Sequence, residues 1–166
     1  MGLRFCSLSS GSSGNCQYIE TENMKILIDA GFSGKRIEAL LASIDVCPST
    51  LDAIFVTHEH TDHIRGVGVL SRRYDLPLYA NESTWLGMES KIGKIKENNI
   101  QIFNSEDFIE MKDLTINPIK IYHDALEPVG YILYYKNKKI SIVTDTGTID
   151  YNIKKKIGLK PIIIKL

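Results

Sequence analysis

The sequence lacks the features of several specialised protein classes. Its 166 residues contain no long uncharged apolar run, so we expect no transmembrane helix and no contact with a membrane. The N-terminus turns to serine and glycine after Cys6, without the apolar core of a signal peptide. Twenty basic residues balance twenty acidic ones, so a global nucleic-acid-binding signature is missing as well. The default expectation is a cytoplasmic globular protein.

Cysteine is also scarce. The three cysteines, Cys6, Cys16 and Cys47, are odd in number and do not show the spacing of paired metal ligands. A disulfide framework would need an oxidising compartment, so we expect reduced, partly buried thiols. No internal repeat or low-complexity linker interrupts the chain. Because its length suits one domain, we predict a single domain over residues 1–166.

Charge is unevenly distributed although the total is neutral. Residues 136–166 contain eight lysines against Asp145 and Asp150. This lysine-rich segment can either meet a polyanion or form a solvated face. The composition favours the solvated face, because most charge runs lie on the surface in water.

Hydrophobic periodicity predicts an α+β fold in which strands dominate the second half. Helices are expected over residues 34–43 after a Ser33 cap, directly after His63, and over residues 83–91. Strands are expected over residues 3–8, 17–20, 25–29, 51–57, 76–80, 100–103, 108–111, 114–122, 129–135 and 140–144.

The densest chemistry lies in residues 55–66. Three imidazoles and the Asp62 carboxylate fall within six residues there: His58, His60, Asp62 and His63. Neutral imidazole and carboxylate are good ligands for zinc, iron and manganese. The His-x-His pair of an extended segment points both rings to one side, and the next two side chains are offset at the start of a helix. This pattern favours two adjacent metals over a polar turn with a capped helix.

Two further residues follow strand ends and complete the candidate site. His123 follows the strand over residues 114–122, and Asp145 follows the strand over residues 140–144. A rigid strand can aim such side chains into a cleft, and a carboxylate is able to bridge two metals. All four histidines of the chain belong to this set. The alternatives are an ordinary histidine and a turn aspartate.

Three other features carry open or unremarkable interpretations. Asp29 ends a strand, and it is either a turn or cap residue or a support behind the site. Residues 9–15 are too rich in serine and glycine for the interior of a helix or strand. They form either a flexible turn or a loop whose backbone N–H groups line an anion site. Trp85 is expected to pack within the fold rather than to serve as a substrate platform.

The motif His58-x-His60-x-Asp62-His63, together with His123 and with Asp145 in Thr-Asp-Thr-Gly, resembles the metallo-β-lactamase superfamily. Residues 27–31 match the first motif of that family. Residues 9–16 and 123–131 resemble its YycJ/WalJ-like branch more closely, and together the motifs cover most of residues 3–147. The resemblance implies an αββα sandwich with the metals at one edge of its two sheets.

The resemblance also implies a role for each residue. The first metal is held by His58, His60 and His123, the second by Asp62 and His63, and Asp145 bridges the two. Asp62 also orients the attacking hydroxide, and Asp29 supports the site from behind. The implied cofactors are two divalent ions, zinc or manganese, with iron as a further option. Members of the branch are regarded as metal-dependent exonucleases that degrade double-stranded DNA from 5′ to 3′.

The sequence departs from the family pattern after Gly147. The family places a further histidine well after that point, often in an Asn-His-Asp setting, where it completes the second metal; here no histidine follows His123. We therefore expect a truncated chain with an incomplete second half and a second metal site that lacks a ligand. The apolar residues 161–166 resemble a buried terminal strand, whose edge a second copy of the chain or another partner would cover.

Three functional hypotheses follow. The leading one is a phosphodiesterase, a DNA exonuclease that uses a metal-bound hydroxide. The second is a truncated fragment that binds metal but is catalytically impaired. The third keeps hydrolysis but changes the substrate to a small ester, thioester, lactone or β-lactam, because loops rather than the fold set substrate class.

Overall fold

Two β-sheets form the centre of the molecule, and the first contains six strands. The computed structural model describes residues 2–158 and 162–165. The strand order is β1-β2-β3-β4-β5-β6, with β1 (Arg4–Ser9), β2 (Cys16–Glu20), β3 (Lys25–Ile28), β4 (Ala53–Phe55), β5 (Leu78–Asn81) and β6 (Ile100–Phe103). The strands from β3 to β6 run parallel. Their carboxyl ends therefore meet at one edge of this sheet.

The second sheet has the order β11-β10-β9-β8-β7. Its strands are β7 (Ile109–Met111), β8 (Leu114–Lys120), β9 (Val129–Tyr135), β10 (Lys138–Val143) and β11 (Ile162–Lys165). Neighbours pair antiparallel except β10 and β11, which run parallel. The expected strand in residues 161–166 is thus present as β11. Residues 161 and 166, the burial of its side chains and the partner expected at its edge lie outside what the structure describes.

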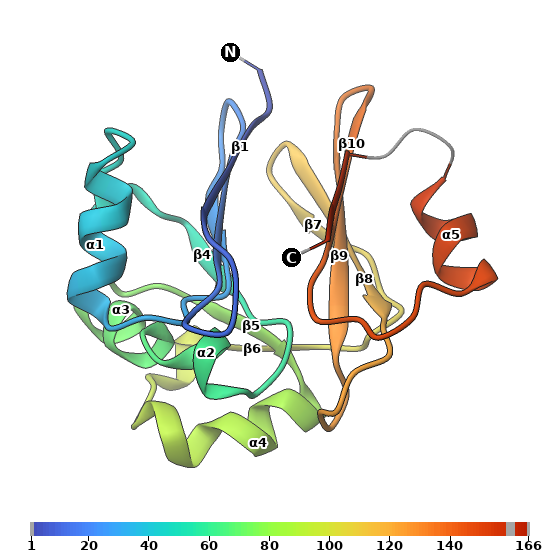
Figure 1. The fold of residues 1–166 in the computed structure, drawn as a ribbon. Coiled ribbons are helices and arrows are strands. Elements are labelled where there is room, and N and C mark those ends of the chain that lie inside the picture. Colours follow the sequence, from blue (N-terminus) through green and yellow to red (C-terminus); the bar gives the residue numbers. More distant parts are fainter. Residues whose placement is uncertain (1, 159–161, 166) are drawn as a thin grey trace.

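Helices cover the outer faces of both sheets. They are α1 (Gly34–Ala42), α2 (Thr61–Ile64), α3 (Val67–Tyr74), α4 (Glu82–Ile92) and α5 (Tyr151–Ile157), with short 3₁₀ turns η1 (Pro48–Thr50) and η2 (Glu97–Asn99). Figure 1 shows α1 outside the first sheet, α5 outside the second, and the two sheets facing each other between them. None of the helices in the described residues has the length and apolar character needed to cross a membrane.

Three apolar clusters fill the spaces between these layers. Alternate residues of a strand point to opposite faces, so Leu27 of β3 joins the cluster beneath α1 and α3. Its neighbours Ile26 and Ile28 join the cluster between the two sheets. A third cluster packs Ile153 and Ile157 of α5 against the second sheet. The layered α+β sandwich that the resemblance implies is therefore confirmed.

Local signals predicted some elements well and missed one. Ser33 accepts a hydrogen bond from the backbone N–H of Arg36 and begins α1 where the sequence predicts it. Trp85 is 7% exposed and packs in the first core as expected. The pattern did not predict α5, because its seven residues contain a single apolar pair at helical spacing. That pair finds its partners only when the second sheet forms. The three cysteines are free thiols, although Cys47 is exposed rather than partly buried.

One buried hydrogen bond ties the second sheet to the strand that leads into the histidine motif. Tyr131 of β9 is fully buried, and its hydroxyl donates to the carbonyl of Val56, directly after β4, at 2.6 Å. Burial, assisted by the nearby negative charge of Asp29, raises the pKa of Tyr131 well above its usual value. The hydroxyl therefore stays protonated and remains a donor.

Replacing Tyr131→Phe should remove this donor and lower the free energy of unfolding by about 1–3 kcal/mol, because a buried carbonyl loses its partner. Tyr135→Phe on the same strand is the matched control, since its buried hydroxyl has no hydrogen-bond partner among the described residues. Urea denaturation of both variants measures the difference. Equal losses in the two variants would contradict the prediction.

Candidate metal centre

Most of the predicted site residues lie on loops that follow strand ends, and Asp62 and His63 lie in the short helix α2. Residues 56–60 follow β4, residues 121–128 follow β8, and residues 144–150 follow β10. The backbone N–H of Val129 donates to the carbonyl of Thr57 at 3.0 Å, so the start of β9 is bonded to the histidine loop of the other sheet. This bond brings loops of both sheets to the same point.

Three imidazoles converge in a first cluster. One ring nitrogen each from His58, His60 and His123 lies within 4.8 Å of the other two. The Nδ1 atom of His60 is 3.1 Å from Nε2 of His58 and 3.2 Å from Nε2 of His123. These are the three residues expected to share one metal, and the tertiary structure brings them together across 63 positions of sequence.

A second cluster shares His58 with the first. It contains His58, His63 and Asp145, again with donor atoms within 4.8 Å of one another. The Oδ2 atom of Asp145 lies 2.7 Å from Nε2 of His63 and 3.9 Å from Nε2 of His58. Asp145 therefore lies close to His63 and farther from His58, the ring that both clusters share.

Asp62 lies beside the second cluster but is not part of it. Its Oδ2 atom is 3.5 Å from Nε2 of His63 and accepts a hydrogen bond from the side-chain amide of Asn15 at 3.2 Å. The side chain is 32% exposed, whereas His63 is fully buried. Asp62 is thus the more accessible of the two residues expected at a second metal.

A buried carboxylate lies behind the histidines. Asp29 accepts hydrogen bonds from the backbone N–H and the hydroxyl of Thr57, both at 2.8 Å. Its Oδ2 atom also lies 2.7 Å from Nδ1 of His63. Asp29 has a positive φ of 61°, a conformation that aspartate tolerates better than most residues. Asp29 contacts Nδ1 of His63, whereas Nε2 of the same ring faces Asp145 in the second cluster.

These contacts favour one tautomer of the His58 ring and the donation of Nδ1–H by His63. When the Thr57 hydroxyl donates to Asp29, it can accept the Nδ1–H of His58, which lies 2.9 Å away. Nδ1 of His63 likewise donates to Asp29. Both rings then present Nε2 to the cluster, which is the arrangement that outer hydrogen bonds produce at metal-binding histidines.

The electrostatics of the two buried rings differ. Burial, together with the neighbouring rings of His63, His60 and His123, lowers the pKa of His58 to about 2. Burial also acts to lower the pKa of His63, but the carboxylate of Asp29, with help from Asp145 and Asp62, raises it to about 9. His58 is therefore a neutral imidazole that can offer a nitrogen lone pair to a metal. His63 is surrounded by carboxylates that favour a positive charge at its ring.

The donor set fits divalent metal ions. A neutral imidazole carries only one N–H, so the three ring nitrogens of the first cluster cannot all be paired with one another by hydrogen bonds. The buried Oδ2 atom of Asp145 accepts no hydrogen bond among the described residues, and its near neighbour is Nε2 of His63 at 2.7 Å. Converging ring nitrogens and a carboxylate oxygen are the groups that a cation binds. Imidazole with carboxylate suits zinc, manganese or iron.

Asn15 is a site residue that the sequence did not reveal. It ends the Ser/Gly loop, is 2% exposed, and its side-chain amide lies 3.0 Å from Nε2 of His63. The loop closes on itself, because Gly11 N–H donates to the Asn15 side chain. The packing leaves no room for a side chain at Gly31, whose Cβ would lie 1.6 Å from the carbonyl oxygen of Asp62. The loop thus ends against the second cluster.

Glu59, between two predicted ligands, was also missed. It is 7% exposed, and its Oε1 atom accepts the backbone N–H of Leu126 at 2.9 Å. That bond attaches the loop carrying His123 to the loop carrying the other two rings of the first cluster. Helix α4 approaches closely because Gly87 has no side chain; a Cβ there would lie 2.6 Å from Cγ of Glu59. The signal in the sequence that could have identified Glu59 is its position as an acidic residue between His58 and His60.

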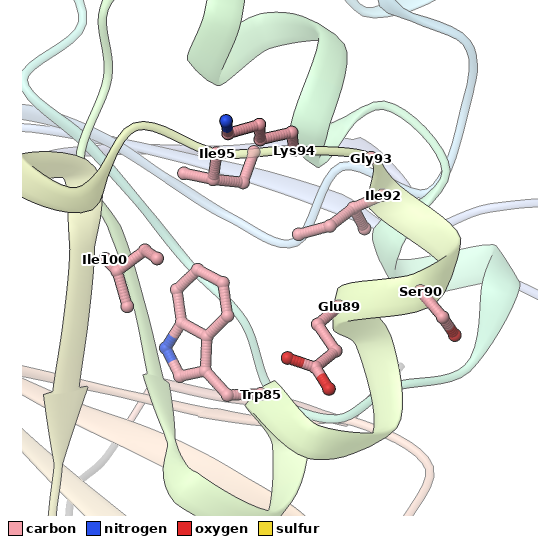
Figure 2. Close-up of a pocket in the computed structure, with 8 residues that line it drawn as sticks. All are labelled: Trp85, Glu89, Ser90, Ile92, Gly93, Lys94, Ile95 and Ile100. Atoms are coloured by element: carbon pink, nitrogen blue, oxygen red, sulfur yellow. The ribbon is translucent and has the colours of Figure 1, made fainter.

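A separate cavity of about 380 Å³ shares no lining residue with the donor clusters. It lies between α4 and the segment leading to β6. Figure 2 shows the ring of Trp85 facing this space together with Ile92, Ile95 and Ile100. The lining is mostly apolar and contains no group of metal ligands, so the cavity adds nothing to the chemistry of the donor clusters.

Known proteins resemble this chain in sequence. The family described as the metallo-beta-lactamase superfamily matches residues 10–157. Exodeoxyribonuclease YycJ of Bacillus anthracis is 45% identical over 154 residues, which are 93% of this chain and 58% of that protein. Exodeoxyribonuclease WalJ of Streptococcus pneumoniae strain D39 is 46% identical over 149 residues, 89% of this chain and 55% of that protein. The chain therefore spans less than two thirds of either relative.

Solved structures resemble it in fold. A metallo-beta-lactamase of Cronobacter sakazakii superposes with a TM-score of 0.68 over 87% of this chain and 62% of that one. The sequences are only 15% identical. The likeness therefore concerns the layered fold and not the substrate.

The first prediction from this geometry concerns Asp29. An Asp29→Asn variant keeps the size of the side chain but has only one acceptor oxygen, so its NH2 group must face either the Thr57 backbone N–H or the Thr57 hydroxyl and His63. We expect zinc affinity to fall about 10–100-fold, the usual effect of losing a hydrogen-bond partner of a ligand. Competition with a chromophoric chelator measures it. Asp75→Asn, at an exposed aspartate paired with Lys96, is the control, and equal affinity in both variants would refute the assignment.

The second prediction concerns Glu59. Glu59→Ala removes the acceptor for Leu126 N–H and should loosen the loop that carries His123, weakening zinc binding about tenfold. Glu59→Gln keeps a carbonyl oxygen at the same place, so its zinc affinity should stay close to that of the unaltered protein. If the glutamine variant binds zinc as poorly as the alanine variant, the hydrogen bond is not what positions His123.

Proposed function

The chain belongs to the metallo-β-lactamase superfamily, whose signature spans residues 10–157, and from this premise we propose that it hydrolyses phosphodiester bonds of DNA with the help of divalent metals. One observation carries the proposal. Four imidazoles and the Asp145 carboxylate converge in two clusters that share His58. Such a set suits two adjacent divalent ions, the arrangement of many phosphodiester-cleaving enzymes.

We assign the donors to two ions. His58, His60 and His123 would hold the first; His63 and Asp62 would hold the second, with Asp145 between them. Zinc or manganese, and also iron, suit these ligands. Bound ions of this kind supply Lewis acidity toward a phosphodiester.

The protein's own groups would prepare the site. Asp29 and Thr57 keep Nε2 of His58 and His63 turned toward the donors. Asp62, the accessible carboxylate, would orient the attacking water and accept its proton. Asn15 would limit the movement of the Asp62 side chain, because its amide donates to that carboxylate. These assignments require a water molecule and a phosphate to approach from the open side of the clusters.

DNA is the proposed substrate because two relatives at 45% and 46% identity are named exodeoxyribonucleases. They extend well beyond the region matched here, so the direction and end preference of cleavage also belong to the proposal. We place the reaction in the cytoplasm, where the three free cysteines would remain reduced.

The test uses His58, the donor common to both clusters. His58→Ala should lower cleavage of linear double-stranded DNA by at least about 100-fold, since even indirect partners of ligands change activity 10–100-fold. Chelation should abolish cleavage in the unaltered protein, and zinc or manganese should restore it. Zinc titration should show fewer bound equivalents in the variant.

Two results would overturn the proposal. One is full DNA cleavage by a metal-stripped sample. The other is metal-dependent cleavage of p-nitrophenyl acetate, a thioester or nitrocefin with no cleavage of DNA, because it would assign the same centre to small esters or lactams. Zinc binding without turnover on any of these substrates would identify a metal-binding chain without catalysis.

A further inference from the structure

Two tyrosines are exposed next to the candidate metal centre. Of the eight tyrosines in the chain, only Tyr122 and Tyr151 are largely exposed, at 56% and 77%, and the others are buried or half-buried. Large aromatic side chains are normally covered in a folded protein. The rings of Tyr122 and Tyr151 are therefore open to a partner at the surface.

Both tyrosines are held close to the residues of the centre. Tyr122 directly precedes His123, and its carbonyl accepts the backbone N–H of Gly147 at 2.9 Å. Its hydroxyl donates to Asp150 at 2.8 Å, the residue before Tyr151. The segment that connects Asp145 to α5 thus runs directly past Tyr122. Tyr122 is thus adjacent in sequence to the proposed ligand His123, and Tyr151 follows the aspartate that the Tyr122 hydroxyl contacts.

Helix α5 continues this surface with positive charge. Ile153 and Ile157 are buried against the second sheet, so the opposite side of the helix faces solvent. Tyr151, Lys154 and Lys155 lie at positions i, i+3 and i+4 and share that exposed side. No carboxylate of the described residues lies within ion-pair distance of either lysine.

Two lysines of the β9–β10 hairpin are engaged with other groups. Lys136 pairs with Glu22 at 3.4 Å. Lys139 donates to the carbonyl of Lys156 at 2.7 Å and lies over the ring of Tyr134. The only carboxylate in residues 146–158 is Asp150, and it is occupied by the Tyr122 hydroxyl and by the N–H of Ile153. The exposed side of α5 therefore carries only positive charge among residues 151–157, while Asp150 places one hydrogen-bonded carboxylate at the start of the helix.

We propose that Tyr122, Tyr151, Lys154 and Lys155 form a track for single-stranded DNA that leads to the metal centre. Bases stack on the two tyrosine rings, and the two ammonium groups neutralise successive phosphates. Aromatic rings alternating with cations are the usual means of holding a single strand without reading its sequence. This inference rests on the proposed function, and it gives the lysine-rich segment a role other than a solvated face.

The binding test uses a fluorescein-labelled, single-stranded DNA of twelve nucleotides, about the upper range that one such surface contacts, with phosphorothioate linkages that resist cleavage. Tyr151→Ala in the zinc-loaded protein should weaken binding about tenfold, whereas Tyr151→Phe should leave it unchanged. An abasic strand of the same length should bind the alanine variant and the unaltered protein equally. That comparison separates stacking from charge.

Charge is tested on the same oligonucleotide. The double variant Lys154→Gln, Lys155→Gln should weaken binding. The slope of log K against log salt concentration should become less steep by about 1.4, since each phosphate contact on a single strand contributes about 0.7 to that slope. The control neutralises Lys35 and Arg36, exposed residues of α1 on the opposite outer side of the molecule (Figure 1). Hydrolysis of bis(p-nitrophenyl) phosphate, which has no bases and a single phosphate, should be the same in all of these variants.

The outcomes separate this inference from the proposed function. If the unaltered protein cleaves DNA but the α5 variants bind the oligonucleotide as it does, the track is wrong and the function stands. If the unaltered protein neither cleaves nor binds DNA, both are wrong. If the α5 and α1 variants lose binding equally, the effect is general charge, and the track is again refuted.

Discussion

The buried carboxylate of Asp29 is the constraint on which the arrangement of the site depends. It is fully buried, and it accepts from the backbone and hydroxyl of Thr57 while contacting Nδ1 of His63. Burying a charge is unfavourable unless hydrogen bonds and opposite charge compensate it. The polypeptide around Asp29 is therefore restricted to conformations that keep these partners in place, and this orients both the strand end before His58 and the turn holding His63.

The groups that balance the negative charge of Asp29 also connect the site to the fold. The pKa of His63 rises to about 9 because Asp29, Asp145 and Asp62 surround a ring that burial alone would keep neutral. Divalent cations at the same point would meet the same demand for positive charge. The second sheet contributes to this balance through Asp145 and His123, and it is fastened to the first by the Tyr131 hydroxyl and the Val129 N–H. Neither sheet contains a complete donor cluster by itself.

Much of the fold was predictable because its signals are local. Ser33 begins a helix by capping it, and strands such as β3 alternate between two apolar cores. The missed helix α5 is short and depends on the second sheet for its stability. The family resemblance and its YycJ/WalJ-like branch are confirmed by the relatives, whereas the role of each ligand remains a prediction.

The supporting residues were harder to predict. Thr57 and Glu59 stand within the motif, but their hydrogen bonds reach Asp29 and Leu126, which are 28 and 67 positions away. Asn15 belongs to a Ser/Gly loop whose composition indicates only irregular structure. A side chain that acts through such distant contacts has no characteristic local spacing. The exposed tyrosines give no local signal either, because exposure depends on the finished surface.

The sequence by itself determined the donor types, because three imidazoles and a carboxylate at the spacing of His58, His60, Asp62 and His63 have few other uses. It also determined the mixture of helices and strands, since the periodicity of most elements lies in neighbouring residues, whereas the layered sandwich was implied by the family resemblance. Only the tertiary structure decided that His58 is shared by two clusters, that Asp145 joins His58 and His63 in the second, and that Asp62 is set slightly apart. Those facts depend on how two sheets pack, and that packing is a sum of long-range contacts which no stretch of the chain contains alone.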